Sequence, residues 1–140
     1  MNNLSENIDG GKVSFSFHKD ERLCSKKIID KLFSEGKSIF AFPLKIAYLE
    51  IPLNSKYKVQ AAFSVGKRNF KKAVQRNLIK RRMREAYRLN KSNFYKELGE
   101  KQVAVFFIYT GKNIPEFRQI EEAVKKGLKK ITQETSGKNL

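Results

Sequence analysis

The chain has 140 residues and carries 30 Lys and Arg against 14 Asp and Glu, which gives a formal net charge of +16 and a pI near 10.0. This length suits one domain with a modest core, and this charge favours an anionic partner, either nucleic acid or a membrane surface. One cysteine and one histidine exclude a disulfide framework or a Cys/His zinc site within a single chain, and no apolar run reaches the roughly 18 residues of a membrane span.

The N-terminal residues contain Gly10-Gly11, few apolar side chains and no apolar region of a signal peptide. We predict a disordered tail over residues 1–14 and an intracellular, cytoplasmic protein. Phe17 and its neighbours then alternate aromatic and polar residues, as in a short extended segment that lays one aromatic ring against the domain. A single RNA-binding domain is predicted over residues 15–132, followed by a frayed tail over residues 133–140.

A first helix is predicted over residues 25–35. Ser25 can cap its N-terminus, and Gly36 suits the position just beyond its C-terminus. Apolar side chains recur at helical spacing on one face of this segment, at Ile28, Ile29, Leu32 and Phe33. Phe33 therefore fits the core as one interpretation, and a second interpretation is given below with the family resemblance.

Two strand-like segments follow, over residues 38–51 and 57–66, with a turn between them. Pro43 interrupts the first segment and indicates an edge strand or a bulge. Apolar residues alternate with small or polar ones in both segments, so each strand has two unlike faces. The small and polar face is made by Lys45, Ala47, Gln60, Ala62 and Ser64. Such a face can receive an extended strand of nucleic acid, and plain solvent exposure is an equal alternative.

The stretch from Lys67 to Arg88 contains ten of the 30 Lys and Arg and only one acidic residue, Glu85. From Ala73 onward, apolar residues mark one buried helix face, at Ile79, Met83, Ala86 and Tyr87. At about 100° per residue, a second set falls within an arc of roughly 140° beside that face. We call this set the basic arc, and its members are Arg76, Asn77, Lys80, Arg81, Arg84 and Arg88.

A solvated charged helix is the plainer interpretation of the basic arc. Solvated helices usually mix charge signs, so that residues four positions apart attract one another. Here like charges stack at Arg76/Lys80, Lys80/Arg84 and Arg84/Arg88, and each pair is destabilising by a few tenths of a kcal/mol. This repulsion favours a helix that binds a polyanion, and the planar arginine fork suits phosphate oxygens.

After the basic helix, residues 102–110 form a continuous apolar run typical of a buried central strand. Helical spacing then follows Pro115 and continues to about Thr132. We therefore expect an α+β fold in which a small sheet packs on helices. The predicted order is helix, two or three strands, basic helix, strand and helix.

The acidic residues do not suggest a catalytic site. Two-metal phosphodiester hydrolysis needs clustered carboxylates or histidines on a fixed scaffold. The two acidic pairs, Asp20-Glu21 and Glu121-Glu122, are sequence neighbours, and neighbours on a helix point about 100° apart. We predict an RNA binder with no catalytic residue, no metal site and no cofactor of its own.

The basic stretch resembles the protein component of bacterial ribonuclease P, the ribonucleoprotein that removes 5′ leaders from precursor tRNAs. The similarity is carried by a basic lead-in and a motif, namely Lys67, Arg68, Lys71 and Lys72, then Arg76, Asn77, Lys80, Arg81 and Arg84. Leu78 stands where the family motif has an arginine. A weaker similarity extends from about Phe15 to Ile131.

The resemblance implies an accessory subunit that binds the catalytic RNA subunit and the 5′ leader of precursor tRNA. The lead-in and the basic arc are the expected contacts to the RNA subunit. Expected leader contacts are Phe17, Phe33, Lys45, Ala47, Gln60, Ala62 and Ser64. In this second interpretation, Phe33 borders the leader cleft instead of filling the core.

The resemblance also implies that the RNA subunit, and not this chain, holds the catalytic Mg²⁺. It further implies a left-handed crossover for the strand–helix–strand unit around the basic helix. A ribosomal-type RNA-binding protein is the alternative function, since it shares the charge and the size. Membrane and DNA partners are not expected, because membrane binding needs an unburied apolar helix face and this one is needed for the core.

Overall fold

The computed structural model describes residues 17–135, so the predicted tail over residues 1–14 and the last residues, 136–140, lie outside the described part. In chain order the elements are a 3-10 turn η2 (Lys19–Glu21), α1 (Lys26–Glu35), β1 (Lys37–Ala41), β2 (Leu44–Glu50), β3 (Val59–Val65), α2 (Ala73–Leu98), β4 (Val103–Tyr109) and α3 (Phe117–Thr135). The helix α3 therefore continues three residues past the predicted end at Thr132.

The four strands form one mixed sheet in the order β1-β2-β4-β3. Neighbours β1 and β2 are antiparallel, as are β2 and β4, whereas β3 and β4 run parallel. The parallel pair is joined through α2, the long crossover that a parallel connection needs. The strand β4 lies between β2 and β3, which agrees with its continuous apolar run. The predicted α+β fold and element order are confirmed, and the handedness of the β3–α2–β4 crossover stays a prediction.

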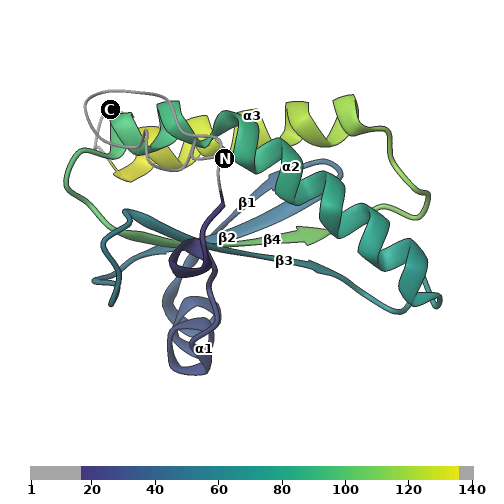
Figure 1. Ribbon diagram of the computed structural model, residues 1–140, viewed down its shortest axis with the longest axis horizontal. Helices are drawn as coiled ribbons and strands as arrows, with labels where there is room; N and C mark the ends of the chain where they lie inside the picture. The colour runs from purple at the N-terminus through teal and green to yellow at the C-terminus, as the bar shows by residue number, and fades with distance from the viewer. Residues whose placement is uncertain (1–16, 136–140) are drawn as a thin grey trace, which may run out of the picture.

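The sheet separates two unequal layers of helices. Figure 1 shows α2 and α3 lying side by side over one face and α1 alone against the other. We call these the covered face and the α1 face. Alternation along β2 divides its residues between them, since Ile46 and Tyr48 belong to the covered-face core and Ala47 to the α1-face core.

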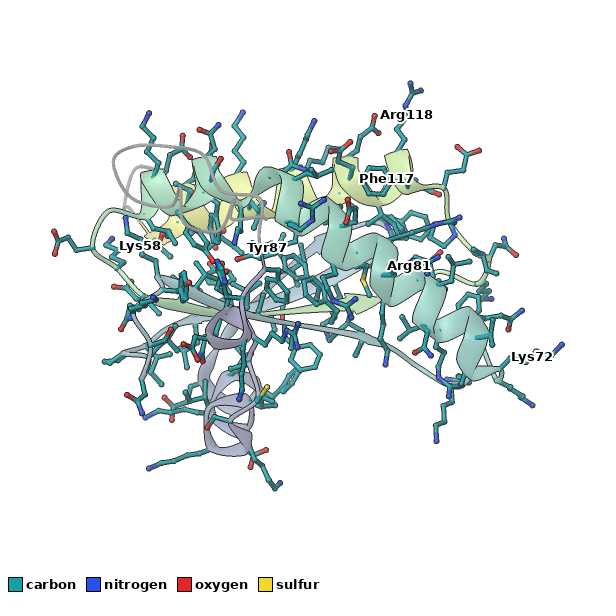
Figure 2. The ribbon with its side chains drawn as sticks, viewed as in Figure 1. Lys58, Lys72, Arg81, Tyr87, Phe117 and Arg118 are labelled. Atoms are coloured by element: carbon teal, nitrogen blue, oxygen red, sulfur yellow. The ribbon has the colours of Figure 1, made fainter. Side chains whose placement is uncertain are left out.

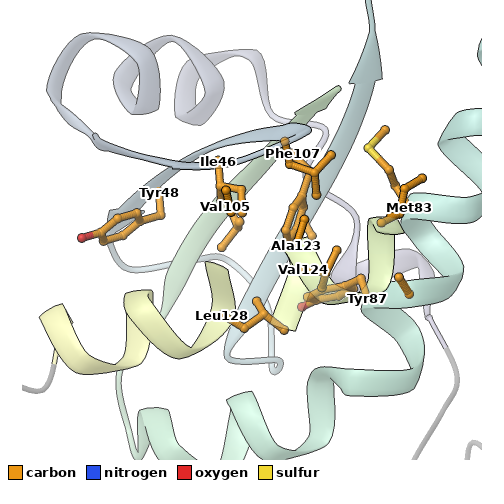
Figure 3. Close-up of a cluster of buried hydrophobic side chains, with 14 of the residues drawn as sticks. Ile46, Tyr48, Met83, Tyr87, Val105, Phe107, Ala123, Val124 and Leu128 are labelled. Carbon is orange, nitrogen blue, oxygen red and sulfur yellow. The ribbon is translucent and has the colours of Figure 1, made fainter. Parts of the chain in front are cut away.

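The covered face holds the main core. Figure 3 shows Val105 and Phe107 of the sheet facing Val124 of α3 and Tyr87 of α2. All four side chains are fully buried. Each such side chain contributes about 1.5–3 kcal/mol relative to an exposed one. This packing fixes α2 against the sheet, and the buried stripe of α2 is the one that the sequence predicted.

The helix α1 begins and ends as predicted. The Ser25 hydroxyl accepts a hydrogen bond from the Ile28 backbone N–H and caps the helix. At the other end, Gly36 has a φ of −76°, which any residue can adopt. Glycine is needed there because neighbouring atoms leave no room for a side chain. A Cβ there would lie 2.3 Å from the Leu32 carbonyl oxygen and 2.7 Å from that of Tyr48.

The predicted strand over residues 38–51 is in fact two strands, β1 and β2, joined by a tight hairpin at Phe42-Pro43, whose peptide bond is cis. Proline cannot donate to the sheet ladder, so the chain reverses there. The Pro43 carbonyl accepts from both the backbone N–H and the hydroxyl of Thr110. Of the two predicted alternatives, the bulge is not present at this point, whereas β1, which ends just before Pro43, is an edge strand.

Candidate nucleic-acid interface

The first half of α2 presents the basic arc to solvent. Asn77, Arg81 and Arg84 are exposed, and the other members of the arc are half-buried. Figure 2 shows Arg81 on α2 and Lys72 at the N-terminal end of that helix. The first turn of α2 contains no acidic residue. The arc is therefore a surface of concentrated positive charge, which is the electrostatic footprint of a polyanion-binding helix.

Arg76 lies at the start of the arc and holds the basic lead-in. Its Nη1 donates to the carbonyl oxygens of Phe70, at 2.8 Å, and Lys71, at 2.9 Å. Phe70 is buried and packs against Tyr109, so the loop is anchored from both sides. These contacts keep the exposed lead-in cations beside α2, which gives Arg76 a structural role in addition to its predicted RNA contact.

Two further arginines of α2, Arg82 and Arg88, also bind protein groups. The Arg88 Nη2 atom lies 2.5 Å from the Glu85 carboxylate, and this hydrogen bond lowers the Glu85 pKa. Arg82, which the helix phase places away from the arc, donates through Nη1 to the Pro115 carbonyl at 2.5 Å. The charge of Arg88 is thus partly neutralised by Glu85, so Arg88 is less suited to an RNA contact than Arg81 or Arg84. Arg82 binds the segment that leads into α3.

A buried ion pair, which the sequence analysis missed, fixes the N-terminal segment. The Glu21 carboxylate lies 2.5 Å from the Lys91 ammonium and also accepts from the Tyr95 hydroxyl at 2.5 Å. Glu21 and Lys91 are 0% and 3% exposed at their side chains. Burial lowers the Lys91 pKa, and the Glu21 carboxylate opposes that shift. A lysine on the apolar stripe of α2, four residues after Tyr87, was the signal that could have indicated a buried charge, though not its partner.

The segment anchored by Glu21 runs along the edge of β3. The Leu23 backbone N–H donates to the Ala61 carbonyl at 2.9 Å, and Arg22 forms an isolated parallel bridge with Ala61. A hollow of about 400 Å³ opens there, which we call the β3-edge hollow. It is lined by Phe17, Arg22, Leu23, Ala61, Ala62, Phe63 and Arg84. One member of the basic arc therefore borders a cavity that reaches the sheet.

On the α1 face, helix α1 covers only part of the sheet. Beyond it the register aligns one residue from each strand into a row, Phe40, Lys45, Ile108 and Ser64. Phe40 and Lys45 are exposed, whereas Ile108 and Ser64 are half-buried. We call this row with the neighbouring Ala62 the open sheet face. The predicted open face therefore exists, and Lys45, Ala62 and Ser64 lie on it.

Three predicted leader contacts lie elsewhere. Ala47 is 4% exposed in the core under α1, so the prediction that it lines an open face is wrong. Gln60 donates through Nε2 to the Asp20 carbonyl at 3.1 Å and is held against the N-terminal segment. Phe17 packs on Phe63 from the covered-face side, with ring centroids 5.9 Å apart, and thus reaches the β3-edge hollow but not the open sheet face.

Phe33 is 53% exposed, so it is not the core residue of the first interpretation. Its ring lies against Phe106 of β4, with centroids 5.1 Å apart. Phe106 and Ala62 are aligned on neighbouring strands. The half-exposed Phe33 ring thus stands at the border between α1 and the open sheet face, where a base can stack on it.

Within residues 17–135, no three His, Cys, Asp or Glu side chains lie close enough together to hold a metal ion. In the same range, none of the helices has the length and apolar character that crossing a membrane requires. The described residues that do gather into a site are cations, aromatic rings and small side chains, which suit phosphates and bases.

Known proteins place this arrangement in one family. The family model described as ribonuclease P matches residues 17–132. A ribonuclease P protein component from Porphyromonas gingivalis is 37% identical over 123 residues, covering 84% of this chain and 88% of the relative. A relative of the same description from Chlorobium phaeobacteroides is 34% identical over 121 residues, covering 78% and 83%.

The fold is shared with solved structures. The RNase P protein from Thermotoga maritima superposes with a TM-score of 0.62 at 26% identity, covering 79% of this chain and 96% of that one. The Staphylococcus aureus RNase P protein at 21% identity gives a TM-score of 0.61, covering 79% and 94%. The resemblance of the basic stretch is confirmed over nearly the whole described chain. The chain belongs to the ribonuclease P protein family.

Proposed function

We propose that this chain is the protein subunit of ribonuclease P and carries two RNA sites, one for the RNA subunit and one for the 5′ leader of precursor tRNA. The observation that supports it best is the β3-edge hollow, where Arg84 of the basic arc and Ala62 of the open sheet face line one cavity. The two surfaces are thereby continuous, so one protein can hold the RNA subunit and a substrate strand at the same time.

The basic arc and the lead-in bind the RNA subunit. Arg81 and Arg84 are exposed and project from a rigid helix, so their guanidinium groups meet phosphates without reordering the backbone. About six phosphate contacts would weaken binding roughly a thousandfold between 50 and 200 mM salt, by the scale known for duplex DNA. Leu78 is half-buried, which agrees with an apolar residue at the third motif position.

The open sheet face binds the leader. A leader is single-stranded, so both its phosphates and the faces of its bases are accessible. Lys45 can meet a phosphate, Phe33 can stack a base, and the small side chains of Ala62 and Ser64 let the backbone approach the sheet. Mature tRNA lacks the leader, so these contacts distinguish the precursor from the product.

We propose further that the RNA subunit supplies the hydrolytic chemistry and binds its Mg²⁺. The candidate interface is lined by cations, which repel a metal ion and attract the RNA that can carry one. In this proposal the protein positions RNA groups and neutralises their repulsion. It acts in the cytoplasm, in complex with the RNA subunit and precursor tRNA.

The direct test is a cleavage assay with the RNA subunit, precursor tRNA and a low Mg²⁺ concentration, with and without this protein. We expect cleavage at the leader junction to be rescued by the protein at low salt. A ribosomal-type RNA-binding protein would bind the RNA without restoring cleavage, and that outcome would replace the proposal with the alternative.

A further inference from the structure

Two large aromatic rings stand exposed at the β1–β2 hairpin, at the outer end of the open sheet face and beyond the expected leader contacts. Phe40 is 67% exposed and Phe42 is 64% exposed, and their ring centroids lie 6.2 Å apart. Single exposed apolar residues are ordinary on protein surfaces. Two neighbouring exposed phenylalanines form an apolar patch, and such a patch often marks a binding site. Leaving these rings in water forgoes the stabilisation that their burial would give.

The register connects these rings to the open sheet face. Phe40 is paired directly with Lys45, which is paired with Ile108, which is aligned with Ser64. Directly opposed residues point to the same side of a sheet, so the four side chains form one row across all four strands. Three strand spacings of about 4.8 Å make this row roughly 14 Å long. Phe40 and Phe42 lie at its outer end, at the far edge from the β3-edge hollow.

We propose that Phe40 and Phe42 form a distal base-stacking site, which takes leader nucleotides beyond those held near Phe33 and Ser64. The inference rests on the proposed function, because it assumes that the leader lies on the open sheet face. Flat rings with open faces accept any base, and the exposed Lys45 between the rings and Ser64 supplies a charge for the connecting phosphate. The site therefore extends the leader contacts in length, without sequence preference.

A second copy of this chain is the competing occupant, since β1 is an edge strand with an apolar ring on it. Charge argues against that partner. Each copy carries a net charge of +16, the edge strand β1 carries the exposed Lys37, and the exposed Lys45 is paired directly with Phe40. A lysine on an edge strand hinders pairing with another strand, and Lys45 beside Phe40 attracts an RNA strand.

The experiment measures the affinity of the reconstituted holoenzyme for precursor tRNAs with leaders of roughly 4 and roughly 10 nucleotides, within the usual range of single-strand site sizes. The double variant Phe40→Ser/Phe42→Ser is compared with wild type and with Leu89→Ser. Leu89 is an exposed apolar residue of α2 that lies outside the basic arc. We expect the double variant to lose roughly fivefold or more in affinity for the long leader and to bind the short one normally.

A third variant separates stacking from plain apolar contact. Phe40→Leu/Phe42→Leu keeps apolar side chains but removes the rings, and it should behave like the serine variant. Full long-leader affinity in either double variant overturns the inference. So does sedimentation that shows a wild-type dimer abolished by the serine variant, because a second copy then covers the rings.

The same measurements distinguish failure of the distal site from failure of the proposed function. If wild type binds precursor and mature tRNA equally well at both leader lengths, the leader site itself is refuted and the distal site with it. If wild type selects the precursor but gains nothing from the longer leader, only the distal site is overturned.

Discussion

The two faces of the sheet are built from the same four strands and differ in what covers them. Two long helices close the covered face, so that Ile46, Val105 and Phe107 are fully buried. One helix of ten residues lies on the other face and leaves Lys45, Ser64 and Ile108 in contact with solvent. The difference separates stability from the proposed function, because the first face supplies the larger buried core and the second leaves residues open for the proposed RNA contact.

Neighbouring residues on β4 give the sharpest version of this comparison. Phe107 is fully buried on the covered face, whereas Phe106 is half-buried on the α1 face. We expect Phe107→Ala to lower the free energy of unfolding by about 3–5 kcal/mol, through lost burial and a cavity. Phe106→Ala should cost clearly less stability and weaken precursor binding, since Phe33 loses its support. Denaturant unfolding with a substrate-binding assay checks both, and equal stability losses would contradict the division of the two faces.

The Glu21–Lys91 pair tests the edge where the two faces meet. Glu21→Leu leaves Lys91 buried without its carboxylate and should destabilise the fold by about 3–5 kcal/mol. The double variant Glu21→Leu/Lys91→Met should recover part of that loss, because no buried charge is then left unpaired, while the Tyr95 hydroxyl still lacks its acceptor. Thermal unfolding of both variants decides. A double variant as unstable as the single one would show that the pair is not the cause.

The covered face should also control alkaline stability. The pKa values of Tyr48, Tyr87 and Tyr109 are raised, with burial as the main cause, and the three lie in the covered-face core. A raised folded pKa means that stability is complete below the unfolded value near 10 and is lost as pH rises above it.

We therefore expect the free energy of unfolding to fall by about 1.4 kcal/mol per pH unit for each tyrosine that stays protonated above pH 10. Lys91, whose pKa is lowered, acts in the opposite direction just below its unfolded value. Urea unfolding across pH 8–11, in wild type and Tyr109→Phe, measures this. A pH profile unchanged in the Phe variant would argue against the assignment.

The smallest expected effects concern two adjacent arginines of α2. Arg81 is exposed on the basic arc, whereas Arg82 is bound to the Pro115 carbonyl. We expect Arg81→Ala to weaken RNA-subunit binding and to reduce the slope of log affinity against log salt by about 1. Arg82→Ala should leave that slope unchanged and lower stability by about 1 kcal/mol. Filter binding at several salt concentrations distinguishes them, and equal slopes would mean that the assumed RNA face is wrong.

Much of the fold and of the basic arc could be predicted from the sequence, because local patterns determine these features. The spacing of Ile79, Met83 and Tyr87 fixes which face of α2 is buried. That phase alone places Arg81 on the basic arc and Arg82 away from it. The cap at Ser25 and the apolar run of β4 are likewise local signals. These features depend on neighbours a few residues away, which a sequence displays directly.

The errors concern contacts between distant segments. The alternation that marks Ala47 as a small-face residue is real, but only the position of α1 determines that this residue is buried. The pair Glu21–Lys91 joins residues 70 positions apart, and neither residue type indicates its partner. Apolar alternation also continues on both sides of Pro43, so the sequence pattern marks an interruption there but does not separate β1 from β2.

The central claim is that the open sheet face selects precursor tRNA through its leader, and Ala62→Trp tests it most directly. Ala62 is half-buried at the edge of that face and lines the β3-edge hollow, so a bulky ring there blocks the leader path. Glu97→Trp, an exposed position near the end of α2, adds the same bulk elsewhere as the control. The measurement is the affinity of the holoenzyme for precursor and mature tRNA. The account predicts that Ala62→Trp lowers precursor affinity and keeps mature tRNA affinity, and equal losses for both, or no loss for either, would contradict it.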